Sequence, residues 1–112
     1  MRYCLALDLQ RDAALIAEYE AWHRNVWPEI KASIVESGIE RMEIYRLGER
    51  LFMIIDAGPD FSFERKAAMD AGNPAVERWE ALMWKYQVAV PGGKPGEKWR
   101  LMERIFLLDQ TK

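Results

Sequence analysis

Two side chains that can take part in proton transfer, Tyr19 and His23, lie four residues apart in a stretch with helical periodicity. Residues at this spacing project from the same face of a helix, so a phenol and an imidazole placed there can reach one ligand. His23 is the only histidine of the chain, and imidazole can both donate and accept protons near neutral pH. If the protein carries out acid/base chemistry, His23 is the first candidate.

The spacing of Tyr19 and His23 also fits a simpler interpretation. Tyrosine and histidine are often half-buried, so Tyr19 could pack between helix and sheet while His23 is a hydrogen-bonded, partly buried residue without a catalytic role. Spacing alone favours this packing interpretation, and further observations are needed to support catalysis.

Tryptophan is abundant, with five residues in 112. An indole has a large flat apolar face and one hydrogen-bond donor, which suits stacking on the C–H face of a sugar as well as packing in a core. Trp79 and Trp84 are five residues apart, or about 140° around a helix, so we do not expect them to serve the same purpose. The other three indoles fit packing positions, namely Trp22, Trp27 and Trp99.

Six glutamates fall where exposed helix faces are expected, and we interpret them as solvated charges: Glu18, Glu20, Glu36, Glu64, Glu77 and Glu80. Glu29 follows Pro28 and is expected to favour the positive end of its helix. Asp8 and Asp56 lie at apolar strands and could face a cleft, although neither has a visible partner.

Composition limits the classes of function. The length fits one domain spanning residues 1–112, and the content of 50% hydrophobic and 30% charged residues is that of a globular protein. A formal net charge of −2 argues against binding to nucleic acid or to a membrane surface, because both depend on clustered Lys and Arg.

Neither a metal nor another cofactor is expected. One cysteine and one histidine do not form a zinc or iron motif, and the chain contains no glycine-rich phosphate loop. The first residues lack the pattern of a secretory signal, so the expected location is the cytoplasm.

The order of elements predicts the fold. Alternating apolar residues indicate strands over residues 3–9 and 42–47, and a short apolar run indicates a strand over residues 51–55. The second and third strands form a hairpin, and a fourth strand is expected over residues 99–108. Helices are expected after Asp12, from Pro28 to Gly38, and over residues 63–69 and 74–86, with Asn73 as a cap. A loop covers residues 91–96. This α+β order is the ferredoxin-like split βαβ arrangement, with four antiparallel strands and helices on one face. The other sheet face then needs a cover, which a homodimer would supply.

The chain resembles the L-rhamnose mutarotase family over nearly its whole length. The resemblance rests on Tyr19-x-x-x-His23-x-x-x-Trp27-Pro28-Glu29, Ile44-Tyr45, Arg78-Trp79 and Trp84-Lys85-Tyr86. It implies a cofactor-free dimer of the dimeric αβ-barrel type that interconverts the α and β anomers of a 6-deoxyhexose. It also implies that His23 is the proton donor and that Tyr19 contacts the sugar.

Two features depart from the family pattern, and a third indicates a branch of the family. Met42 stands where the family has a further substrate-binding tyrosine, three residues before Tyr45, and the family's adjacent Trp-Trp pair is divided between Trp79 and Trp84. The segment 94–99 resembles the branch associated with L-fucose. The resemblance therefore assigns substrate contacts to Tyr19, Met42, Tyr45, Trp79 and Trp84, with L-rhamnose or L-fucose as substrate.

Mutarotation requires a proton taken from the anomeric hydroxyl and one given to the ring oxygen, which suits a histidine without a metal. Two other classes remain open, because the fold alone does not decide function. One is a sugar-binding or regulatory module without catalysis. The other is a small cofactor-free oxygenase or isomerase of the dimeric αβ-barrel type.

Overall fold

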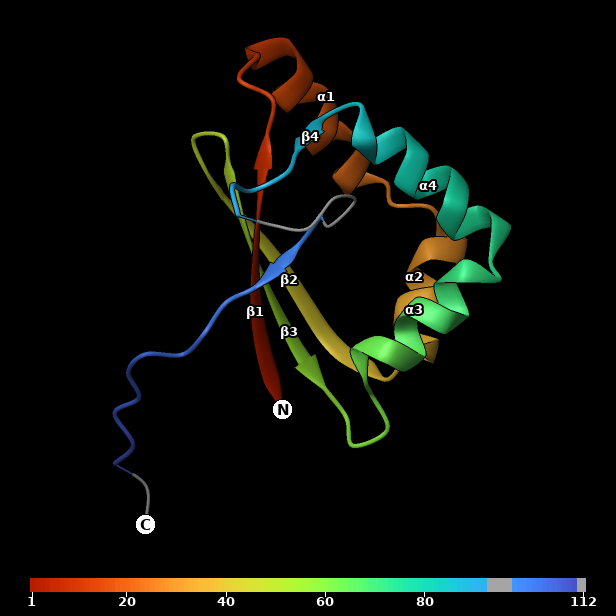
Figure 1. The fold of residues 1–112 in the computed structure, drawn as a ribbon. Helices are drawn as coiled ribbons and strands as arrows, with labels where there is room; N and C mark the ends of the chain where they lie inside the picture. Colours follow the sequence, from red (N-terminus) through yellow and green to blue (C-terminus); the bar gives the residue numbers. More distant parts are fainter. Residues whose placement is uncertain (93–97, 111–112) are drawn as a thin grey trace.

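The computed structural model describes residues 1–92 and 98–110, which form an antiparallel sheet with helices on one face (Figure 1). The elements in chain order are β1 (Arg2–Leu9), α1 (Ala13–Arg24), α2 (Pro28–Glu36), β2 (Ile39–Leu47), β3 (Arg50–Ala57), α3 (Phe63–Ala71), α4 (Pro74–Trp84), β4 (Gln87–Val88) and β5 (Arg100–Leu101). The strand order is β2-β3-β1-β4, and β5 also pairs with β1. The expected α+β class is confirmed.

Local sequence signals determine where the helices begin. The side chain of Asp12 accepts hydrogen bonds from the N–H groups of Ala14 and Leu15 at the start of α1, and Asn73 caps α4 in the same way. Proline occupies the first turn of both α2 and α4, where its missing N–H costs no helical hydrogen bond. After α2, Gly38 has a φ of 102°, a conformation that side chains disfavour. These helix signals are confirmed.

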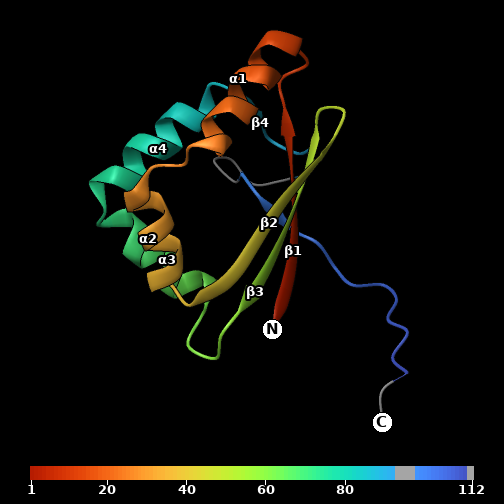
Figure 2. The ribbon, with the colours of Figure 1, turned by 180° about the vertical axis from the view of Figure 1, so that it is seen from behind.

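The core lies between the sheet and the helices and contains two clusters. In β1, Leu5, Leu7 and Leu9 are buried and point toward the helices, as the alternation predicted. One cluster gathers around Tyr19, with residues from α1, α4 and the neighbouring strands. The other gathers around Met53 and includes Phe61. The helices therefore cover one face of the sheet, and the opposite face has no such layer (Figure 2).

The fourth strand differs from the prediction. Only Arg100–Leu101 forms a strand, and the N–H of Met102 still donates to the carbonyl of Cys4. The chain then leaves the sheet (Figure 1), and β4, which the sequence had not indicated, occupies another part of the β1 edge. Apolar content alone does not tell how far a segment pairs with its neighbour, and the prediction of a strand over residues 99–108 is wrong beyond this short pairing. Most of the predicted loop, residues 93–96, lies outside the described residues.

We call residues 102–110 the C-terminal arm. Its apolar side chains are exposed, including Ile105 at 93% and Phe106 at 77%. Large apolar side chains in such a state mark a surface that another molecule covers, or else a liability for aggregation.

The outer face of the sheet has an apolar centre between ion pairs. Paired residues of β1 and β3 supply the centre, Cys4 with Ile54 and Ala6 with Phe52. On either side, Arg2 binds Asp56 and Arg50 binds Asp8. Asp8 and Asp56 therefore have arginine partners on the outer face and do not face a cleft. Within the described residues, no helix is long and apolar enough to cross a membrane.

Candidate active site

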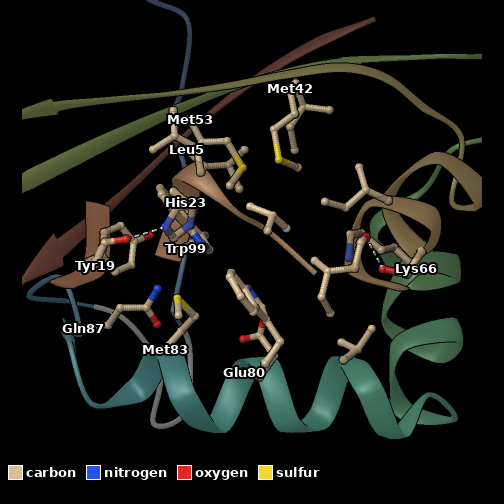
Figure 3. Close-up of a pocket in the computed structure, with 18 of the residues that line it drawn as sticks. Leu5, Tyr19, His23, Met42, Met53, Lys66, Glu80, Met83, Gln87 and Trp99 are labelled. Carbon is tan, nitrogen blue, oxygen red and sulfur yellow. Dashed lines mark hydrogen bonds between the residues drawn. The ribbon is translucent and has the colours of Figure 1, made fainter. Parts of the chain in front are cut away.

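A cavity of about 540 Å³ lies between the sheet and the helices (Figure 3). The strands contribute apolar side chains such as Leu5, Met42 and Met53, and the helices contribute Tyr19 and His23. Its volume is within the range of small-molecule sites, which are typically apolar clefts with a few polar groups.

His23 is the titratable imidazole of this cavity, located in the last turn of α1. Its Nδ1 lies 2.9 Å from the carbonyl oxygen of Tyr19. A carbonyl oxygen can only accept a hydrogen bond, so we assign the proton to Nδ1. In the neutral ring the other nitrogen, Nε2, is then left as a proton acceptor. The helix backbone thus selects a tautomer that can act as a base.

The surroundings of His23 favour the neutral ring. Burial lowers the pKa of His23 below its ordinary value of 6.5, and the hydrogen bond to the Tyr19 backbone opposes this effect only in part. Aromatic rings lie on two sides, with centroids at 4.3 Å for Tyr19 and 5.7 Å for Trp79. At neutral pH the imidazole is therefore mainly uncharged and ready to take a proton.

Tyr19 has the opposite chemical character. Its side chain is buried, and burial raises its pKa to about 12, with the amide of Gln87 opposing the rise and the charge of Glu80 adding to it. The phenol is a weak acid under these conditions and stays protonated. It can orient a ligand by a hydrogen bond, and it is less suited than His23 to proton transfer near pH 7.

The structure brings together four of the six residues assigned to the site from the sequence. Tyr19, His23, Met42 and Trp79 all line the cavity, with Trp79 only 7% exposed. The cavity lies where α1, which carries Tyr19 and His23, meets the buried face of α4. The structure therefore places Tyr19 and His23 in one cavity with Met42 and Trp79.

Tyr45 does not line the main cavity. Its side chain is 52% exposed, and its hydroxyl donates a hydrogen bond of 2.6 Å to Glu43. Tyr45 does border a second, shallower hollow of about 290 Å³, which Tyr19 and His23 also border. Strand alternation explains the difference, because Ile44 faces the cavity and its neighbour Tyr45 faces the other way.

Trp84 is also outside the cavity. Its side chain is 40% exposed, and the Nζ atom of Lys98 lies 4.4 Å from its ring centroid. The five-residue separation from Trp79 predicted different roles for the two indoles, and the structure confirms this.

Sequence reasoning missed four polar residues of the cavity, namely Ser33, Lys66, Glu80 and Gln87. Glu80 is exposed, as expected for a solvated charge, and its Oε2 lies 2.6 Å from the Nζ of Lys98. It also borders the cavity. Gln87 carries no sequence signal, since it belongs to the unforeseen strand β4. For Glu80 the signal was its position directly after Trp79, a residue of the cavity.

The mostly apolar walls of the cavity also carry an imidazole, a phenol, a carboxylate and a carboxamide, together with the hydroxyl of Ser33 and the ammonium of Lys66. In the described residues, no group of three His, Cys, Asp or Glu side chains is arranged to hold a metal ion. Such a lining suits a small ligand with several hydroxyl groups and one apolar side.

The sequence model of the L-rhamnose mutarotase family matches residues 2–108. The chain belongs to this family. It is 54% identical over 112 residues to an L-fucose mutarotase of Xanthomonas campestris pv. campestris, covering 98% of this chain and 90% of that relative. It is 30% identical over 96 residues to an L-rhamnose mutarotase of Acidiphilium cryptum, covering 81% and 86% of the two chains. Mutarotases are isomerases, and membership places the protein in this enzyme class.

The fold comparison agrees with the family. A crystal structure of an L-rhamnose mutarotase from Formosa agariphila superposes with a TM-score of 0.72, covering 97% of this chain and 99% of that one. At 19% sequence identity this likeness establishes the ferredoxin-like fold.

Proposed function

We propose that this protein interconverts the α and β anomers of a 6-deoxyhexose, with His23 as the acid/base residue. The observation that carries the proposal is a neutral imidazole whose Nδ1 is bonded to the helix backbone and whose ring borders a mostly apolar cavity. A base of this kind matches the proton transfers of mutarotation, and the apolar walls match a sugar that has a methyl group at C6.

In the proposed reaction His23 carries one proton between two oxygens of the sugar. Its Nε2 takes the proton of the anomeric hydroxyl while the bond between C1 and the ring oxygen breaks and C1 becomes an aldehyde. The imidazolium then gives its proton to the ring oxygen. Rotation about the C1–C2 bond and the reverse sequence close the ring on the other face of C1. Both oxygens are attached to C1, so one positioned nitrogen can reach them in turn.

Three neighbours complete the proposed site. Tyr19 orients the sugar through its protonated hydroxyl. The indole of Trp79, whose ring centroid is 5.7 Å from that of His23, provides a flat surface for the C–H face of the sugar. Met42 and Met53 line the cavity from the strands and supply apolar surface for the methyl group.

L-fucose is the substrate we favour over L-rhamnose. The two sugars share the C6 methyl group and differ in configuration at C2 and C4, so both fit the chemistry of His23. The relative from Xanthomonas campestris, named for L-fucose, is 54% identical, whereas the relative from Acidiphilium cryptum, named for L-rhamnose, is 30% identical. The difference in similarity supports L-fucose.

We also propose that the working form is a homodimer. The outer face of the sheet has an apolar centre formed in part by Phe52 and Ile54, and the C-terminal arm exposes Ile105 and Phe106. A second copy placed against this face, with its own arm alongside, would remove both surfaces from water. Light scattering at micromolar concentration should give the mass of a dimer, and a monodisperse monomer would contradict this part of the proposal.

The test of the activity is exchange NMR on the two anomers of L-fucose and L-rhamnose, with D-glucose as a control sugar. Purified protein should accelerate anomer exchange of L-fucose most, of L-rhamnose less, and of D-glucose least. Exchange rates equal to those in buffer for both deoxyhexoses would overturn the proposal. Ligand binding without faster exchange would instead indicate a sugar-binding module.

A further inference from the structure

Gln87 is a buried polar residue whose side-chain oxygen has no hydrogen-bond partner in the part of the chain that the structure describes. Its side chain lines the cavity beside Tyr19 and Met83 (Figure 3), and the residue is 6% exposed. The side-chain oxygen, Oε1, is itself buried. Buried side-chain oxygens are nearly always hydrogen-bonded, because an unpaired acceptor destabilises the folded protein. A methionine at position 87 would fill a similar volume without leaving an unpaired acceptor in the folded protein.

The backbone prevents Gln87 from turning its side chain to solvent. Gln87 pairs with Leu9 in the antiparallel ladder between β4 and β1, and the N–H of Gln10 donates a hydrogen bond to the carbonyl of Tyr86. Alternation then places Gln87 inside the molecule and its neighbour Val88, which is 44% exposed, outside. The position of the carboxamide is therefore set by the sheet.

Gln87 also lies at the reactive end of the cavity. Its amide is close enough to the phenol of Tyr19 to favour the phenolate form, and the ring of Tyr19 is in contact with that of His23, at a centroid distance of 4.3 Å. A ligand held at His23 would therefore have hydroxyl groups near Gln87. The amide cannot take up a proton at neutral pH, so its chemistry is hydrogen bonding.

We propose that Oε1 of Gln87 accepts a hydrogen bond from one ring hydroxyl of the sugar and so helps to select the hexose. This inference rests on the proposed function for the identity of the ligand. A fixed acceptor in an apolar wall discriminates strongly, since a sugar that offers no hydroxyl there leaves the acceptor unpaired. The C6 methyl group cannot make this distinction, because L-fucose and L-rhamnose both carry it.

The first test compares Gln87→Met with Gln10→Met. The substitution at position 87 keeps the length of the side chain and removes the acceptor. Gln10 is an exposed glutamine whose side chain donates to the carbonyl of Lys85, so it controls for the change of residue type. NMR titration with L-fucose should show Kd raised about tenfold or more by Gln87→Met, the effect of one lost hydrogen bond to a buried acceptor. Gln10→Met should leave Kd unchanged.

Thermal melting separates binding from a structural role. Because Gln87→Met removes an unpaired buried acceptor, its melting temperature should equal or exceed that of the wild type. A lower melting temperature together with an unchanged Kd would overturn the inference and make Gln87 a packing residue. Titration measures sugar binding and not anomer exchange. Loss of affinity in Gln87→Met therefore supports the hydrogen bond even if the protein does not accelerate exchange, so failure of this inference and failure of the proposed activity remain distinguishable.

The second test removes the hydroxyl from the sugar. Analogues of L-fucose that lack the hydroxyl at C2, C3 or C4 are titrated into the wild-type protein and into Gln87→Met. For one analogue, the Kd of the wild-type protein should rise to the value that Gln87→Met shows with L-fucose. The Kd of Gln87→Met for that analogue should not rise further, because the hydrogen bond is already missing. Additive losses for all three analogues would contradict a bond between Gln87 and a ring hydroxyl.

Discussion

The two faces of the sheet are built from alternate residues of the same strands, yet they differ in chemistry. The helix-facing side combines apolar strand residues with the histidine of α1, which burial keeps neutral. The outer side places charged pairs such as Arg2–Asp56 around an apolar centre. Because side chains alternate along a strand, one segment can line a catalytic cavity and an association surface at once. Ile44 and Tyr45 are neighbours in sequence that belong to different faces.

This separation predicts that substitutions in the cavity change anomer exchange but not association, and that substitutions on the outer face change association but not anomer exchange. The largest effect is expected for His23→Asn. The variant should remain a dimer while anomer exchange of L-fucose falls about 10²- to 10⁴-fold, the usual contribution of a positioned acid or base. Exchange NMR and light scattering on the same sample measure the two properties. A lower melting temperature for His23→Asn, with full activity of the folded fraction, would show that His23 takes no part in the mechanism.

On the outer face, Phe52→Glu should act on association. It replaces a large apolar side chain at the proposed interface by a charge that the partner cannot pair, so the dimer dissociation constant should rise roughly 100-fold or more. Val35→Glu is the matched control, because Val35 is 69% exposed on α2, away from this face. Sedimentation or light scattering over a dilution series gives the dissociation constants. Equal values for the two variants would show that the outer face is not the interface.

Tyr19→Phe should produce a smaller loss in the cavity. The ring continues to fill its buried position, and only the hydroxyl that orients the sugar is removed, so exchange should slow about 2- to 10-fold. Tyr3→Phe serves as the control, since Tyr3 packs against Phe61 and Phe63 in the other cluster. A loss as large as that of His23→Asn would mean that the phenol itself transfers a proton.

The smallest effect is expected for Tyr45→Phe. The family resemblance suggests a sugar contact for Tyr45, but its hydroxyl is bonded to Glu43 and its side chain is half exposed. Removing the hydroxyl should change the exchange rate by less than about twofold, as for surface substitutions outside a site. A tenfold loss measured by exchange NMR would return Tyr45 to the substrate contacts.

Much of this organisation follows from local sequence signals. The caps at Asp12 and Asn73 and the alternation of β1 predicted the helices and the sheet. The spacing of Tyr19 and His23 predicted that the two side chains share one face of a helix. These signals succeed because each depends on residues close together in the chain.

The remaining features depend on which segments meet in space. Residues 99–108 were expected to form a full strand, but pairing with β1 ends at Met102. Gln87 entered the cavity because β4 took another part of the same edge. Glu80 borders the cavity although its residue type is typical of an exposed helix face. These features depend on contacts between residues that are distant in sequence, and a single sequence contains no pattern that predicts such contacts.

The dependence of catalysis on pH tests the central claim most directly, that a neutral His23 takes the first proton. Burial lowers the pKa of His23 below 6.5 in the folded protein, so the ring is protonated and inactive as a base only at more acidic pH. After subtraction of the buffer rate, exchange of L-fucose should rise with pH to a midpoint below 6.5 and stay level through pH 8. A rate that instead increases as the pH falls through this range would show that the imidazolium begins the reaction and would contradict the account.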